Sequence, residues 1–514
     1  MNRYEKEGLN TIRIQSPMGD RQIVTELAED FSLPDYQPEI KRLLRVKATV
    51  SPADKYIGAG SAECSGTVDY CILYSGNDGG LYCTNQTGEY RFTAPVELPA
   101  DFEIGEGFLC DVESVPEMTS GRVVAPRKLS VKCRLRSRMR LYGTRLLGEN
   151  VGDGEDVQRL HGQTACARVF LGAGEPIALG DEILCDAKDR NVRVICAEGQ
   201  VFVTEAAAGS GSVNCRGELC LKLLCCHDDA EEPELPYSVL RRIPFGQQVP
   251  AEGVEVNCDC CARGTCTDIR ITVEEGRILC EASVSLQVRA QRNENIAYTR
   301  DLYSTGRECE TAYTTVALQQ ALRCVNGNFS LNTAIPLEEA GIRPGLAVAD
   351  VSGTAAVTGL EADRGKYFLT GKCRFLVILS DNGELSAQEF EAPFRYETDG
   401  GKEAPTDSDM TVELISCKAK IDGERIGVDA ELAVAAAIRG QSRICTVSEA
   451  SFGGEWKAAG AVYTVCYPAR DDTLWSVARR YHCPVSDLVA RNSLASAPAA
   501  DSPDSLAGVR FLLV

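Results

Sequence analysis

Histidine is scarce in this sequence, with only His161, His227 and His482 among 514 residues. The chain also lacks the GxSxG, HExxH, Walker A and GxGxxG fingerprints in any context that would support them. With 74 acidic residues, some carboxylates will lie close together by chance, so paired acids do not indicate a glycosidase. We therefore predict a protein that is not an enzyme, with no catalytic residue and no cofactor.

Long apolar runs and an excess of positive charge are missing as well. The longest apolar run, 432–438, is far shorter than the roughly 20 residues of a membrane-spanning helix. The N-terminal stretch MNRYEKEGLNTIRIQ has no apolar segment of the kind found in a signal peptide. The net charge of −20 disfavours a nucleic-acid partner or an anionic membrane surface. We expect a cytoplasmic protein without membrane insertion.

Cysteine, in contrast, is abundant, with 24 residues. Because no signal peptide is expected, we predict reduced thiols, many of them buried as small apolar side chains. The run VNCDCCARGTC (256–266) suggests a zinc site, but its CxCCx4C spacing places neighbouring thiols on opposite sides of a strand. Buried thiols are the favoured interpretation, and no metal site is predicted. Late disulfide cross-linking of a thiol-rich structural protein is a further possibility.

The body of the chain repeats itself. Three stretches, 61–76, 212–227 and 366–381, each place a glycine before alternating and then continuous apolar residues. The glycines Gly66, Gly217 and Gly371 are spaced 151 and 154 residues apart. Two further markers agree: an arginine before an alternating run (Arg122, Arg277 and Arg425) and the pair LYGT (141–144) and LYST (302–305). The sequence thus predicts a triplicated body.

Each repeat is typical of antiparallel β structure. Alternating apolar runs are separated by turn segments such as SGNDGG (75–80) and SDNG (380–383). Only 39–44 and 315–322 show short helical spacing, and 398–409 resembles an exposed loop. We predict a mainly β fold of three sandwich or barrel-like repeats. The expected domains are 1–150, 151–298 and 299–443, followed by a linker at 444–460 and a C-terminal unit at 461–514. Within the second domain, residues 206–212 also resemble a short linker.

The C-terminal unit has a different period. Residues 461–467 and 508–514 alternate as strands, and Leu474, Val477, Ala478 and Tyr481 recur with helical spacing between them. Asp472 is predicted to cap a first helix that ends before Pro484, and Ser486 a second helix that ends at Asn492 in left-handed geometry. The predicted order is a small α+β unit of the βααβ type.

The spacing DTLW…A..Y…L…N in this unit resembles a LysM domain. That resemblance implies a two-stranded sheet covered by two helices, and binding of N-acetylglucosamine-containing glycans such as peptidoglycan or chitin. Asp471 stands where the family usually has glycine, and the segment after Asn492 is lengthened by ASAPAADSPD. Both departures lie in loops that resemble the glycan groove of the family.

Seven residues of this unit are candidate contacts with a glycan or a protein partner. They are Asp472, Thr473, Leu474, Trp475, Asn492, Ser493 and Leu494. For Leu474, Trp475 and Asn492 a place in the small core is an equal alternative, and for Asp472 and Thr473 helix capping is. Arg479 and Arg480 indicate either a solvated face or a charge presented to an acidic partner, such as the body of this protein.

The body resembles SPOCS domains, the β-rich repeats of sporulation proteins, through LPDYQPEIKRLLRVKATV (33–50), its GxxxxCxLY-like strands and its LYST box. SPOCS repeats followed by LysM are similar to spore-coat morphogenetic proteins of the SipL and SpoVID type. The resemblance implies a scaffold in the mother-cell cytoplasm, at the forespore surface. Its partner would be the basement-layer protein of the spore coat, a cytoskeletal ATPase. The alternative is a peptidoglycan-binding protein of the wall or cortex.

Overall fold

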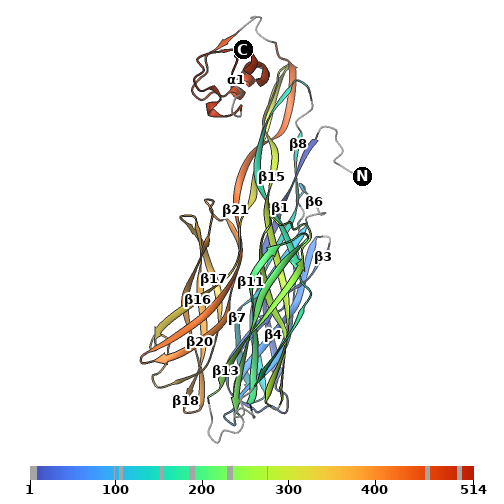
Figure 1. Ribbon diagram of the computed structural model, residues 1–514. Coiled ribbons are helices and arrows are strands. Elements are labelled where there is room, and N and C mark those ends of the chain that lie inside the picture. Colours follow the sequence, from blue (N-terminus) through green and yellow to red (C-terminus); the bar gives the residue numbers. More distant parts are fainter. Residues whose placement is uncertain are drawn as a thin grey trace.

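The computed structural model shows a mainly β protein whose helices lie near the C-terminus (Figure 1). Among the described residues, no helix combines the length and the apolar character that crossing a membrane requires. The structure describes residues 9–58, 60–97, 99–103, 108–150, 154–184, 192–227, 235–274, 276–457, 464–494 and 500–514.

One pairing scheme recurs three times along the body, in unit 1 (9–150), unit 2 (157–304) and unit 3 (307–455). In each unit the opening segment and the penultimate strand both pair antiparallel with a long last strand. The strands between them form a separate antiparallel meander, except the two-residue strand Phe102–Glu103 of unit 1, which also pairs with the last strand. Each unit therefore consists of a long-strand sheet and a meander.

The strand bounds of unit 1 are β1 Leu9–Ser32, β2 Ile40–Val50, β3 Asp54–Gly58, β4 Ser61–Gly76, β5 Leu81–Pro95, β6 Phe102–Glu103, β7 Leu109–Ala125 and β8 Lys128–Asn150. Those of unit 2 are β9 Val157–Ala173, β10 Ile177–Leu184, β11 Val192–Ala208, β12 Ser212–His227, β13 Tyr237–Pro250, β14 Asp259–Glu274 and β15 Arg277–Ser304. Those of unit 3 are β16 Arg307–Pro336, β17 Ala347–Asp363, β18 Lys366–Asp381, β19 Glu384–Asp399, β20 Asp407–Asp422 and β21 Arg425–Glu455.

The core of each unit lies between its two sheets. In unit 1, Tyr70 on β4 and Leu135 on β8 belong to one buried apolar cluster, and units 2 and 3 have equivalent clusters. Alternate residues of each strand face this layer, because successive side chains of a strand point to opposite faces. The predicted sandwich-like β architecture is confirmed.

The marker glycines lie at the centre of each meander, opposite an aromatic residue of the next strand. The pairs are Gly66 with Tyr90, Gly217 with Phe245, and Gly371 with Phe394. A Cβ atom on Gly371 would lie 2.2 Å from the Ala356 carbonyl oxygen and 2.3 Å from the Phe394 ring. Only glycine leaves room for that ring and the neighbouring backbone, which explains why the pattern repeats.

The arginine marker and the LYGT and LYST marker do not occupy equivalent positions in the units that they were taken from. Arg277 and Arg425 are the first residues of β15 and β21, whereas Arg122 lies inside β7. The true counterpart is Lys128, the first residue of β8. LYGT begins 13 residues after the start of β8, but LYST begins 25 residues after the start of β15. Short sequence matches slide easily along alternating strands, because the side-chain period is only two residues.

The two predicted short helices are strands. Residues 39–44 fall largely in β2 and 315–322 in β16. In β2 the pairing register shifts between Ile40 and Arg42 and again between Leu43 and Arg45. Each β-bulge inserts one extra residue, so buried positions recur at spacings of three and four, which imitates a helix. The turns predicted at SGNDGG and SDNG are confirmed, and Asn382 and Gly383 both have positive φ.

The predicted boundaries in the second half of the body lie inside strands. Position 298/299 is within β15, and residues 444–455 of the expected linker belong to β21. Gly453 and Gly454 resemble a linker in sequence, yet this part of β21 pairs with the start of β16. The stretch 206–212 is not a linker, because it contains the end of β11, a hairpin turn at 209–211 and the first residue of β12. The ends of β15, β16 and β21 thereby extend the body towards the C-terminal unit (Figure 1).

The three meanders meet at a common junction. Each first meander strand has a β-bulge, and the bulged residues Leu44, Ile195 and Ala349 are spaced 151 and 154 residues apart, like the marker glycines. All three are buried in a single apolar cluster to which every unit contributes. The units are thus packed around a pseudo-threefold junction, and the next residues, Arg45, Cys196 and Asp350, occupy equivalent places beside it.

Candidate functional site

The C-terminal unit has the predicted βααβ order. Its elements are β22 Val465–Cys466, α1 Leu474–Arg480, α2 Val485–Arg491, the 3-10 helix η1 Pro503–Leu506 and β23 Leu512–Leu513. Leu474, Val477 and Ala478 of α1 are buried against Cys466 and Leu512 of the small sheet. The apolar face predicted for α1 is confirmed, and α1 ends before Pro484 as expected. Residues 461–463 of the predicted first strand lie outside the described residues.

Thr473, and not Asp472, caps α1. The Thr473 hydroxyl accepts a hydrogen bond from the Ser476 N–H at 3.1 Å, and Ser476 Oγ accepts one from the Thr473 N–H at 2.8 Å. Asp472 lies one residue before the cap, where its carboxylate accepts from the Ala469 N–H and pairs with Arg480. Arg480 lowers the pKa of Asp472 below its usual value by this hydrogen bond, with the Ala469 N–H adding to the effect.

Asn492 joins α2 to the C-terminal strand. Its side-chain amide donates to the carbonyl oxygens of Leu488 and Leu513, both at 2.8 Å, and its Oδ1 accepts from the Leu513 N–H at 2.7 Å. The predicted left-handed geometry belongs to the next residue, Ser493, with φ of 48°. The N-cap of α2 is Pro484 rather than Ser486, because Val485 already has helical geometry. Asn492 therefore holds the unit together.

The family model that matches this segment covers residues 469–497. This segment is a LysM domain. The match spans α1, α2 and the residues that flank them. For the chain as a whole, neither the comparison with curated proteins nor the comparison with solved structures found a match.

The LysM domain is docked onto the extended end of the body. Trp475 is 7% exposed, and its indole Nε1–H donates to Asp301 Oδ2 on β15 at 2.8 Å. Its ring packs edge-to-face against Tyr303 with 4.9 Å between centroids. Arg479 donates to both oxygens of Asp301, at 2.7 and 2.8 Å. The sequence left two roles open for Trp475, packing in the domain core or contact with a partner. In the structure Trp475 does both, and the partner is the body of the same chain.

The turn after α1 adds to the docking contact, and Arg300 of β15 also pairs with Asp501 of the C-terminal unit. His482 Nδ1–H donates to the Ser304 carbonyl oxygen at 2.7 Å, and Tyr303 donates its hydroxyl to the Cys483 carbonyl oxygen at 2.8 Å. Trp456, directly after β21, stacks on the His482 ring with 4.4 Å between centroids. We call Trp475, Arg479, His482 and Cys483 the docking face. Both tryptophans of the chain thus lie at this contact.

The docking residues of the body were missed by the sequence analysis. Tyr303 lies in the LYST segment and Asp301 directly precedes it, and that segment indicated only the repetition of the body and its resemblance to SPOCS domains. The hypothesis that Arg479 presents its charge to the acidic body is confirmed, whereas Arg480 pairs with Asp472 inside the domain. The sequence signal that could have indicated them is an acid and an aromatic residue, Asp301 and Tyr303, close together near the end of a long strand.

The seven predicted contact residues divide into two groups. Asp472, Leu474, Trp475 and Asn492 use their side chains inside the domain or at the docking contact. Thr473 and Leu494 are half-buried and Ser493 is exposed. Leu494 packs against the LysM core. Thr473 and Ser493 are therefore the more accessible polar members of the predicted set, and the neighbouring Asp471, outside that set, is exposed as well.

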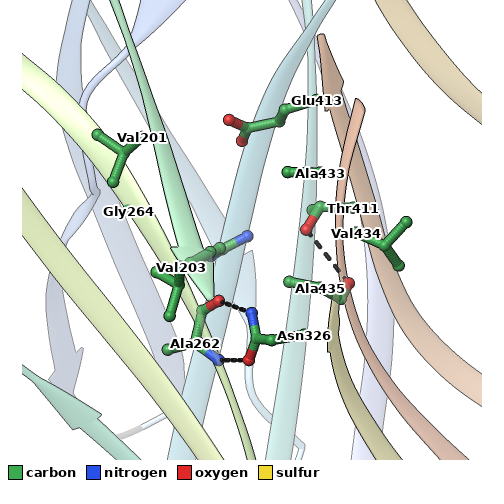
Figure 2. Close-up of a pocket in the computed structure, with 11 residues that line it drawn as sticks. Val201, Val203, Ala262, Gly264, Asn326, Thr411, Glu413, Ala433, Val434 and Ala435 are labelled. Atoms are coloured by element: carbon green, nitrogen blue, oxygen red, sulfur yellow. Dashed lines mark hydrogen bonds between the residues drawn. The ribbon is translucent and has the colours of Figure 1, made fainter. Parts of the chain in front are cut away.

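The body contains a cavity between units 2 and 3. Figure 2 shows Glu413 and Asn326 among the residues that line this cavity. The side-chain amide of Asn326 forms two hydrogen bonds with the backbone of Ala262, at 2.7 and 2.8 Å. Burial raises the pKa of Glu413 to about 7, although Arg263 acts in the opposite direction. The other residues labelled in Figure 2 are apolar, apart from the Thr411 hydroxyl, which donates to the Ala435 carbonyl oxygen. This lining places a single acid, Glu413, beside the cavity.

Removing the cap of α1 should weaken the LysM domain. For Thr473→Ala we expect the domain to lose about 1 kcal/mol of stability, because the Ser476 N–H loses its acceptor. Hydrogen exchange of the α1 amides in the full chain measures this, and exchange should be about fivefold faster. Ser486→Ala is the control, since Ser486 is exposed and does not cap α2. Equal effects of both substitutions would contradict the capping role.

Proposed function

We propose that this protein is a non-enzymatic recognition scaffold. Its β-rich body carries a LysM domain at one end, and that domain binds N-acetylglucosamine-containing glycan such as peptidoglycan. The observation that carries this proposal is the LysM match at 469–497 together with the βααβ order of the same segment.

In this proposal the ligand meets the loops before α1 and after α2. The docking face is occupied by the body, so a ligand reaches the domain from another side. Thr473 and Ser493 border that side. Ser493 is exposed and Thr473 is half-buried, and each has a hydroxyl group that can bind a sugar. Asp472, Leu474, Trp475 and Asn492 act indirectly, by holding the loops in place.

A second candidate function is spore-coat assembly, with the LysM domain docking onto a protein. The observation in its favour is that the α1 face already recognises a protein surface, through an aromatic ring and a charged pair with β15. The likeness of the body to SPOCS repeats supports the same role. The scaffold would then act in the mother-cell cytoplasm at the forespore surface and bind the polymerising basement-layer ATPase of the coat.

A pelleting experiment separates the two candidates. The full chain is incubated with purified insoluble peptidoglycan and, separately, with polymers of purified basement-layer ATPase. Glycan binding predicts saturable pelleting with peptidoglycan and competition by soluble N-acetylglucosamine oligomers. Pelleting only with the ATPase would overturn the glycan proposal and support the coat scaffold.

A matched pair of variants locates the glycan surface. Ser493→Asp adds a negative charge at the loop after α2 where the ligand is proposed to bind, at a positive φ that Asp tolerates. It should weaken peptidoglycan binding about three- to tenfold, because peptidoglycan is itself anionic. Ser486→Asp places the same charge on exposed α2 surface and should leave binding unchanged. Equal weakening by both variants would place the ligand elsewhere.

A further inference from the structure

Three cysteine thiols meet beside the pseudo-threefold junction. Cys71 lies on β4 and Cys83 on β5 of unit 1, whereas Cys196 follows the bulge of β11 in unit 2. Their Sγ atoms all lie within 4.8 Å of one another, and those of Cys71 and Cys83 are 3.5 Å apart. In the part of the chain that the structure describes, no other group of three metal-ligating side chains comes this close together. The cluster joins two units that are far apart in sequence.

The spacing of these thiols suits one thiophilic cation. Thiolates bind Zn²⁺ at about 2.3 Å, so two thiolates on one tetrahedral ion lie about 3.8 Å apart. The Cys71–Cys83 Sγ separation of 3.5 Å is close to that value, and the separations to Cys196 Sγ are at most 4.8 Å. The strands, and not a CxxC motif, bring the ligands together, which is why the sequence did not indicate this site. The VNCDCC run contributes no member to such a group among the described residues.

The surrounding charges favour an anionic metal–thiolate centre. A connected ion cluster lies next to the thiols, with side chains at most 18% exposed: Arg45, Lys47, Lys222, Glu198 and Asp350. These are three cations and two anions. Three thiolates with one Zn²⁺ carry a net charge of −1, which would balance the extra positive charge. Arg45 Nη2 lies 3.7 Å from Cys196 Sγ, directly between the two clusters.

We propose that Cys71, Cys83 and Cys196 bind one Zn²⁺ ion that links unit 1 to unit 2. Cys71 and Cys83 hold the ion from the meander of unit 1, and Cys196 holds it from the bulge of β11. Because the ion binds only when the two units are packed together, it stabilises their packing by mass action. Three thiolates release their protons on binding, so the affinity rises with pH.

The test uses the full chain, reduced and dialysed against Zn²⁺ and then against metal-free buffer. We expect about one Zn²⁺ per chain by elemental analysis. Cys71→Ser, Cys83→Ser and Cys196→Ser should each lower the affinity at least tenfold. Cys220→Ser is the matched control, because Cys220 is also buried in a meander strand but lies outside the cluster. A second readout is Co²⁺ substitution of the unmodified chain, in which thiolate-to-cobalt charge-transfer bands should appear.

Three results would overturn the proposal. The first is a zinc content far below one ion per chain together with no thiolate bands from Co²⁺. The second is loss of zinc from Cys220→Ser equal to that from the cluster variants. The third is a Cys71–Cys83 disulfide in protein prepared with immediate thiol blocking, since these two thiols would then be unable to act as ligands. The cobalt spectrum does not depend on the variants, so it decides the matter even if a substitution prevents folding.

Discussion

Glu198→Gln should destabilise the body by about 3–5 kcal/mol at neutral pH, because it removes one anion from a buried ion cluster. The Glu198 side chain is 10% exposed and contacts Arg45 and Lys47, with Lys47 Nζ 2.5 Å from Oε2. After the substitution, three cations would share only Asp350, and the new amide N–H groups would face a cation. The three units pack around this cluster, so we expect the loss to reach all of them.

The effect of this substitution should depend on pH. Burial would raise the pKa of Glu198, but Arg45, then Lys47 and Lys222, overcome it and hold the pKa below its usual value. A carboxyl whose folded-state pKa is lowered stabilises the fold fully above its unfolded pKa of about 4.3, and that contribution is lost as pH falls towards the folded pKa. The stability difference between the unmodified chain and Glu198→Gln should therefore be largest near pH 7 and shrink below about pH 4.

Urea unfolding followed by circular dichroism, at several pH values, measures both effects. Glu391→Gln is the matched control, since Glu391 also pairs with a lysine and an arginine but is 42% exposed. An exposed pair contributes roughly 0–1 kcal/mol, so the control should unfold almost like the unmodified chain. Equal effects of the two substitutions, or a Glu198→Gln effect that is constant from pH 7 to pH 3, would contradict the role of the buried cluster.

Asp301→Ala should release the LysM domain from the body. Asp301 accepts hydrogen bonds from Trp475 and Arg479 of the docking face, and its side chain is 17% exposed. Hydrogen bonds to a charged group contribute roughly 1.5–3 kcal/mol each, less where solvent reaches them. We expect the docking equilibrium to shift by about 3 kcal/mol, which is roughly a hundredfold.

Tryptophan fluorescence reports this release directly. Trp456 and Trp475 are the two tryptophans of the chain, and both lie at the docking contact. Release exposes their rings to water, so the emission should move to longer wavelength, while small-angle scattering should show a larger radius of gyration. The far-ultraviolet circular dichroism should stay unchanged, because neither the body nor the LysM domain unfolds.

Two neighbouring arginines provide the control for docking. Arg479→Ala removes the partner of Asp301 and should reproduce the fluorescence shift. Arg480→Ala removes a side chain that pairs with Asp472 inside the domain and should leave the emission unchanged. An unshifted spectrum for both Asp301→Ala and Arg479→Ala would show that the ion pair does not hold the domain in place.

Much of the architecture could be predicted from local pattern. Apolar alternation indicated antiparallel strands, and the recurring glycines indicated a triplicated body, because a glycine is needed wherever a ring packs against the backbone of the next strand. The helical spacing of Leu474, Val477 and Ala478 predicted α1. Short-range patterns predict such elements because side-chain direction follows the local backbone geometry.

The helix ends and the strand register could not be predicted from local sequence, because several residues or pairings were equally suitable and contacts with distant residues selected one of them. Thr473 and Asp472 are both residue types that cap helices. In the structure Asp472 pairs with Arg480, eight residues later, and Thr473 caps α1. In β2, bulges set by pairing with β4 produced a helical spacing within a strand. The strands β15 and β21 run past the expected boundaries because they have pairing partners there.

The sequence by itself determined the β-rich character of the body, its threefold repetition and the LysM domain, because each is expressed in patterns of residues that are close together along the chain. Only the tertiary structure decided that Trp475 and Arg479 meet Asp301, 174 and 178 residues away, and that Cys196 joins Cys71 and Cys83. These contacts depend on how whole units pack against one another. Burial and charge pairing between distant strands do not produce a periodic pattern in the sequence.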